Sequence, residues 1–217
     1  MLLISSQTEL TTSVTDAVIA IECVAIMAYL RRAPRGDQWR TRVWCCVFGL
    51  MALSSFLGAL AHGLEMSKPI REALWKPLYL SLGILVALFM VGAVTDSRGQ
   101  AFARRLVPWG ILVGAAFYGM TELFDGAFIV FVIYEATVLV SALGIYVYLI
   151  FTRRVKGAGV VALGILLNLI AAAVQASHVS FFFLVPFDHN GVFHLIQMLS
   201  TALLGIGLRM GMQPGES

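Results

Sequence analysis

The sequence predicts an all-α polytopic membrane protein with seven transmembrane helices in one bundle. Of its 217 residues, 59% are hydrophobic and 12% are charged, and the mean hydropathy is +0.88. Such values are typical of integral membrane proteins rather than of soluble domains. A bilayer core needs about 20 apolar residues per helical crossing, and seven such stretches use most of the chain. Residues 1–217 are therefore expected to form a single transmembrane domain.

The seven predicted spans follow one another with short connections, so neighbouring helices are expected to be antiparallel. The predicted spans are Thr12–Leu30, Val43–Leu64, Leu74–Val94, Leu106–Leu123, Ala127–Phe151, Val160–Val185 and Val192–Met212.

The basic residues predict the orientation of the bundle. Twelve of the 15 Lys and Arg residues lie in the first, third and fifth connections or near the end of the last span, and only Lys68, Arg71 and Lys76 lie on the other side. Basic residues collect on the cytoplasmic side of membrane proteins. The N-terminus is therefore expected outside and the C-terminus inside, in a membrane of the bacterial inner (plasma) type.

Taken in order, the spans carry their polar residues at similar depths. The first carries Asp16, the second ends at His62, the third has no acidic residue, and the fourth ends near Glu122. The fifth carries Glu135, the sixth Asn168, Gln175 and His178, and the seventh begins at His189, Asn190, His194 and Gln197. With alternating directions, most of these residues fall in the outer half. This asymmetry predicts a pocket open to the outer face and an inner half with few polar residues.

Histidines dominate this predicted pocket. His62 ends an ascending span and His194 lies in the first turns of a descending one, so both lie at one membrane level. Asn190, His194 and Gln197 share one helical face, and His189 is close enough to reach inward. Ionisable side chains at membrane depth are costly and usually mark a site. Imidazole is a common zinc ligand, so His62, His194 and His189 are the candidate ligands of one zinc ion per chain. The third ligand stays open between His189, His178 and neither of them.

A zinc ion at this position would suit hydrolysis of an amide or ester, because it activates a bound water and polarises a carbonyl. Glu122 and Asp16 are the candidate acid–base residues, as proton shuttle or as orienting groups. Asn190 and Gln197 are the candidate substrate-binding residues. Interfacial contact with headgroups or water is an alternative role for His62 and His189, and Glu135 can instead be paired with a neighbouring helix.

The seven-helix plan, with His62 ending the second span and Asn190-x-x-x-His194 opening the seventh, resembles the CREST superfamily of membrane hydrolases. This superfamily includes alkaline ceramidases, progestin and adipoQ receptors and hemolysin-III-like proteins. Its pattern is Ser-x-x-x-His on the second helix, Asp on the third and His-x-x-x-His on the seventh, with the histidines holding zinc. The resemblance implies ligand roles for His62 and His194. The chain departs from it at Gly58, at Asn190 and in a third span without an acid.

The resulting hypothesis is a zinc-dependent membrane hydrolase of a lipid amide or ester. Its expected partners are membrane lipid and a lipid or small amphipathic ligand, and not nucleic acid. One alternative is a non-enzymatic seven-helix receptor or ligand-binding protein, in which Asn190, Gln197 and Glu122 hydrogen-bond the ligand. Another is a haem-binding electron carrier, since two histidines at one level are able to ligate iron.

Overall fold

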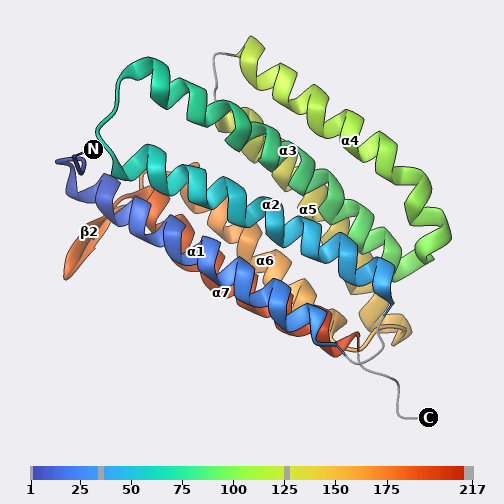
Figure 1. Cartoon of the computed structure of the whole chain (residues 1–217). Helices are drawn as coiled ribbons and strands as arrows, with labels where there is room; N and C mark the ends of the chain where they lie inside the picture. Colours follow the sequence, from blue (N-terminus) through green and yellow to red (C-terminus); the bar gives the residue numbers. More distant parts are fainter. Residues whose placement is uncertain (1, 34–36, 125–127, 213–217) are drawn as a thin grey trace.

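The structure, a computed structural model, describes residues 2–33, 37–124 and 128–212, which form seven long helices and one hairpin (Figure 1). Each of these helices is long and apolar enough to cross a membrane. The predicted all-α, seven-helix architecture is therefore confirmed. The helices are α1 (Gln7–Arg31), α2 (Gln38–Gly63), α3 (Lys68–Arg98), α4 (Gln100–Leu123), α5 (Phe128–Thr152), α6 (Ala158–Gln175) and α7 (His189–Met210), and the hairpin strands are β1 (Phe181–Phe183) and β2 (Val185–Phe187).

Six helices close a ring, and α4 lies outside it. The order around the ring is α1, α2, α3, α5, α6 and α7, and α7 packs back against α1. Helix α4 packs mainly on α3 and touches α5 only slightly, as its place at the edge of the bundle in Figure 1 shows. The α3–α4 contact depends on two glycines, because a Cβ atom on Gly114 would lie 2.9 Å from the backbone of Gly83. Spatial order thus departs from chain order at α4.

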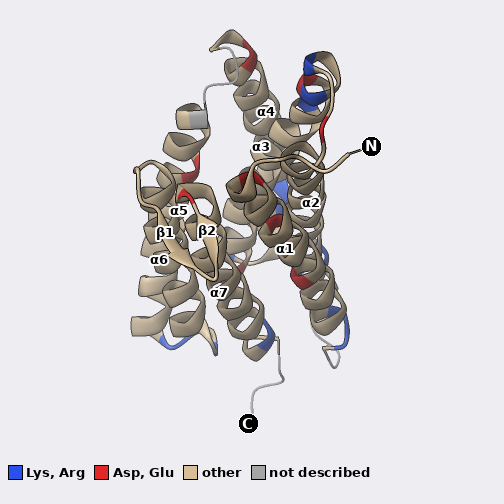
Figure 2. Cartoon of the chain, turned by 90° about the vertical axis from the view of Figure 1, so that its left-hand side faces the viewer, with Lys and Arg blue, Asp and Glu red and all other residues tan. Residues whose placement is uncertain are grey.

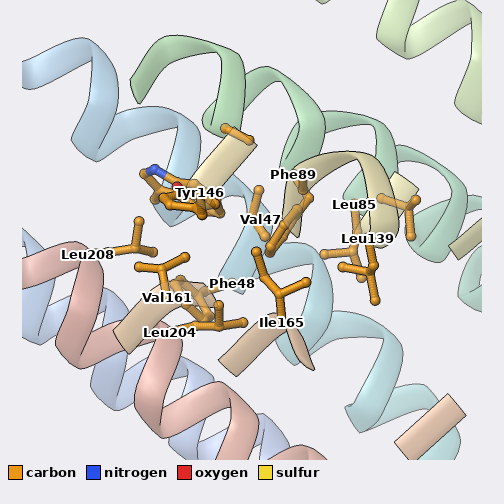
Figure 3. Close-up of a cluster of buried hydrophobic side chains, with 14 of the residues drawn as sticks. Val47, Phe48, Leu85, Phe89, Leu139, Tyr146, Val161, Ile165, Leu204 and Leu208 are labelled. Atoms are coloured by element: carbon orange, nitrogen blue, oxygen red, sulfur yellow. The ribbon is translucent and has the colours of Figure 1, made fainter. Parts of the chain in front are cut away.

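The apolar core lies in the middle of the bundle. The Trp44 ring packs edge-on against the Phe89 ring, with 5.1 Å between centroids. Along α2, the core residues Trp44 and Phe48 separate Arg40 on one side from the residues after Leu50 on the other. The core therefore divides the bundle into two ends. Figure 3 shows the core side chains that α2, α3, α5, α6 and α7 contribute: Val47, Phe48, Leu85, Phe89, Leu139, Tyr146, Val161, Ile165, Leu204 and Leu208.

The two ends differ in charge. We call the end where α2 finishes and α7 begins the histidine end, and the end where α2 begins and α7 finishes the arginine end. Figure 2 shows Lys and Arg gathered where α7 finishes, with a smaller group at the start of α3. This is the distribution from which an outside N-terminus is predicted, and the orientation stays a prediction.

The sixth predicted span is wrong in its last third. Helix α6 ends at Gln175, and the chain then folds into the β1–β2 hairpin, which turns at Leu184 with φ 61°. Hydropathy alone does not distinguish an apolar hairpin from a helix end, so the run of Phe, Leu and Val after Val179 looks like more helix. Consequently His178 lies beyond α6, where it is exposed.

A second correction concerns the arginine end, where the sequence analysis expects few polar residues in the bundle. Because α2 begins at Gln38 and α3 continues to Arg98, both Arg40 and Asp96 lie in helices rather than in connections. Nε and Nη2 of Arg40 donate to the Asp96 carboxylate at 2.5 and 2.9 Å, and the Tyr146 hydroxyl donates to it at 2.7 Å. The Asp96 side chain is fully buried. This charged cluster joins α2, α3 and α5.

Candidate functional site

A cavity of about 490 Å³ lies inside the ring towards the histidine end. All six ring helices contribute to its lining, and α4 does not. We call it the histidine pocket. Six of the seven predicted site residues line it, and Glu122 is the exception. Its polar lining residues are Thr12, Asp16, Ser54, Ser55, His62, Glu135, Gln175, His189, Asn190, His194 and Gln197.

His194 is buried between two side chains of α1. Its Nδ1 atom lies 2.8 Å from the hydroxyl oxygen of Thr15, and its Nε2 atom lies 3.5 Å from Oδ1 of Asp16. The Thr15 hydroxyl donates to backbone carbonyls of its own helix at 2.9 and 3.0 Å, so it is left to accept from Nδ1–H. This arrangement assigns the proton to Nδ1 and directs the lone pair of Nε2 towards Asp16. Asp16 and His194 thus form a buried pair able to share a proton.

Gly58 makes the space that Asp16 occupies. A Cβ atom at Gly58 would lie 2.6 Å from Oδ2 of Asp16. This is the position, four residues before His62, where the CREST pattern has a serine. In this chain the Asp16 carboxylate of α1 lies beside Gly58, a feature of helix packing that the sequence of α2 alone does not reveal.

His62 is held from its other side by a carboxylate. Its Nδ1 atom lies 2.6 Å from Oε2 of Glu9, at the start of α1. The Trp75 ring packs edge-on against the imidazole at a centroid distance of 5.5 Å. The ring is therefore fixed in orientation by α1 and α3, and it is half-buried at the pocket wall. Sequence analysis missed Glu9, because an acid in a first helical turn is common and gives no specific signal.

The start of α7 is fixed by a helix cap. The Asp188 carboxylate accepts from the backbone N–H of Gly191 at 3.0 Å and from the Thr12 hydroxyl at 3.4 Å. This cap sets the direction of the first turn, which brings His189 and Asn190 to the pocket. Asn190 accepts a hydrogen bond from Gln175 Nε2 at 3.4 Å.

Glu135 is a buried acid of the pocket lining that the predicted site does not include. It is 5% exposed, and its Oε1 atom accepts from Asn168 Nδ2 at 3.0 Å. The anticipated pairing with a neighbouring helix is therefore confirmed. Its Oε2 atom is buried without a hydrogen-bond partner among the described residues. An acidic residue within an apolar span is uncommon and usually functional, and this could have identified Glu135 from the sequence.

Glu122 lies apart from the other predicted site residues. It is on α4, outside the ring, and its exposed carboxylate lies 3.8 Å from Nζ of Lys76. His178, which the sequence analysis placed in the sixth span, is also absent from the pocket lining. Neither side chain is positioned to act on a molecule in the histidine pocket.

The pocket fits zinc in its donor chemistry but not in its number of converging donors. Histidine ligands usually donate their second ring N–H to an orienting group, and His62 and His194 each have Nδ1 engaged by a side chain of α1. A catalytic zinc site takes three protein ligands. Among the described residues, no three His, Cys, Asp or Glu side chains are close enough together to hold a metal ion.

Comparison with known proteins places the chain in a family without assigning an activity. Residues 11–213 match the model of a family described as a family of unknown function, DUF6962, and the chain belongs to that family. No curated protein matches the chain. No solved structure matches it either.

Proposed function

We propose that this chain is an integral membrane protein that binds a small amphipathic ligand in the histidine pocket. The observation that carries the proposal is the composition of the lining. Ligand pockets are typically cavities of about 300–1,000 Å³, mostly apolar, with a few convergent polar groups. The histidine pocket has a volume in this range and contains such groups.

The two sides of the pocket differ in a way that suits an amphipathic molecule. The adjacent helices α1, α2 and α7 contribute Asp16, His62, His194 and other polar side chains. The adjacent helices α3 and α5 contribute a mainly apolar wall, in which Glu135 of α5 is the acidic residue. A ligand with one polar group and one hydrocarbon part satisfies both. The apolar residues of that wall are Leu78, Leu82, Leu85, Ile129, Phe131 and Val132.

Thermal stabilisation by candidate ligands tests this proposal. The protein, in nanodiscs of neutral lipid, is heated with a series of short-chain amides, esters, alcohols and amines. A pocket ligand raises Tm saturably. Gln197→Leu, which alters the lining, is expected to lose that response. Gln38→Leu, an exposed position at the arginine end, is the matched control and should keep it. Equal responses in the two variants, or no saturable response in the wild type, would contradict the proposal.

A zinc-dependent hydrolase of a lipid amide or ester is the second candidate. The orientation of the two histidines favours it, since each uses Nδ1 for a side chain of α1, and Nε2 of His194 lies 3.5 Å from the Asp16 carboxylate. In that reading Asp16 is the acid–base group and Asn190 and Gln197 hold the substrate.

Metal content of the detergent-purified protein separates the two candidates. About one zinc per chain by mass spectrometry, lost in both His62→Ala and His194→Ala, would support the hydrolase and justify assays with lipid amides and esters. Wild-type protein that holds no metal after incubation with zinc would rule it out and leave ligand binding.

A further inference from the structure

The histidine pocket holds hydrogen-bond acceptors that have no donor. Oε2 of Glu135 and Oε1 of Gln175 are both buried without a hydrogen-bond partner among the described residues. Both residues line the pocket. The other buried unpartnered polar atoms belong to residues outside its lining. A buried acceptor without a donor is unfavourable, so a molecule that supplies N–H or O–H groups is favoured there.

The acidic and basic side chains that line the pocket are carboxyl groups and histidines. Asp16 and Glu135 line it, and no Lys or Arg is among its lining residues in the described part of the chain. The nearest basic residue along α3, Lys76, is directed instead to the exposed carboxylate of Glu122. A ligand carboxylate or phosphate would therefore meet carboxyl groups and no Lys or Arg, and the pocket histidines His62 and His194 already have Nδ1 engaged by side chains of α1. A ligand cation would meet acceptors.

The aromatic lining also suits a cation. Trp75 and Tyr79 of α3 stack with 5.7 Å between their ring centroids. Phe193 of α7 is buried and lines the pocket. Phe131 also lines the pocket. Aromatic faces attract ammonium groups, and the attraction grows when water is excluded.

We infer that the ligand of the histidine pocket is an amphipathic amine, bound as its ammonium form. Its N–H groups donate to an unpartnered acceptor of the pocket, Glu135 Oε2 or Gln175 Oε1, and its hydrocarbon part lies along the apolar wall of α3 and α5. This inference rests on the proposed ligand-binding function and specifies the chemical class of the ligand.

Four probes with one chain length and different headgroups test the inference. Octylamine, octanol, octanamide and octanoate are titrated into the protein in phosphatidylcholine nanodiscs, and binding is followed by Tm and by the fluorescence of Trp75. Octylamine is expected to bind at least about tenfold more tightly than octanol, since a charged hydrogen bond is stronger than a neutral one. Octanoate is expected to bind most weakly. The Trp75→Phe variant identifies the fluorescence change that comes from the pocket.

Variants connect the preference to the two acceptors. Glu135→Gln is expected to lower octylamine affinity about tenfold and to leave octanol affinity nearly unchanged. Gln175→Met removes the second acceptor at the end of α6 and provides an independent measurement if Glu135→Gln folds poorly. Glu122→Gln makes the same change of acid to amide on α4, outside the pocket, and should change neither affinity.

The outcomes separate this inference from the proposed function. If octanol and octanamide bind saturably and octylamine has no advantage, or if both acceptor variants leave octylamine affinity unchanged, the amine inference is overturned and ligand binding stands. Octanoate binding as tightly as octylamine would overturn it in the same way. If none of the four probes binds saturably, both the inference and the proposed function are overturned.

Discussion

The two ends of the bundle each bury charged side chains, but they satisfy them differently. At the arginine end, the Asp96 carboxylate accepts from two nitrogens of Arg40 and from the Tyr146 hydroxyl. At the histidine end, Glu135 accepts from Asn168 and from no other described residue, and Asp16 lies 3.5 Å from His194 at the pocket wall. Buried polar groups with all partners present hold helices together, whereas unsatisfied groups favour a further partner. The arginine end is accordingly a structural clamp, and the histidine end holds the proposed binding site.

The largest expected effect comes from breaking the clamp. Asp96→Ala leaves the Arg40 guanidinium buried without its partner, and such a change typically costs about 3–5 kcal/mol. The free energy of unfolding, measured by denaturant titration in mixed micelles, should fall by about this amount. Replacing both partners in an Arg40→Met, Asp96→Leu double variant should recover most of the loss. Wild-type stability of the single variant would show that Asp96 is not a clamp.

A smaller loss of stability, with loss of ligand binding, is expected from Gly58→Ala at the other end. The added methyl group would lie 2.6 Å from the Asp16 carboxylate, so the acid must shift and the pocket wall must change shape. Overpacking of this kind costs about 1–3 kcal/mol. Gly119→Ala is the control, because nothing lies within 4 Å of a Cβ atom there. If Gly58→Ala binds the ligand as tightly as the wild type does, Asp16 does not contribute to the binding site.

Two variants that remove one hydrogen bond each sharpen the comparison. Tyr146→Phe removes the hydroxyl from the clamp, and Thr15→Val removes the hydroxyl that orients His194. Each is expected to cost about 0.6 kcal/mol, the typical size of an interhelical hydrogen bond in a membrane. Only Thr15→Val should alter ligand affinity, because His194 lines the pocket and Asp96 does not. A change of affinity in Tyr146→Phe would mean that the two ends are coupled.

The smallest effect is expected from the exposed pair on the outside of the ring. The carboxylate of Glu122 and Nζ of Lys76 are 3.8 Å apart and both side chains are exposed. Surface ion pairs contribute about 0–1 kcal/mol. Lys76→Gln should therefore change both the unfolding free energy and the ligand affinity very little. A large loss of ligand affinity would show that Glu122 takes part in the site, as the sequence analysis predicted.

The sequence predicted the convergence of the site because helix alternation alone determines it. Seven apolar stretches joined by short connections must alternate in direction, so the end of the second and the start of the seventh lie at one level. His62, His189, Asn190, His194 and Gln197 were brought together by this argument without knowledge of helix rotation. The same argument from helix direction placed Glu122 at that depth along the bundle axis. Depth does not specify which neighbours a helix has within the bundle. Helix α4 lies outside the ring, so Glu122 lies outside the pocket lining, near Lys76.

Composition by itself determined the class of protein, the number of long helices and the end of the bundle at which the histidines meet, because hydrophobicity and chain direction are local properties. Only the tertiary structure decided which side chains complete the site. Thr15 and Asp16 reach His194, and Gly58 admits Asp16, because of the rotation and close packing of α1 and α2. Likewise Arg40 finds Asp96 because α2 and α3 extend beyond their apolar stretches. These pairings depend on distances between helices far apart in sequence, which hydropathy does not encode.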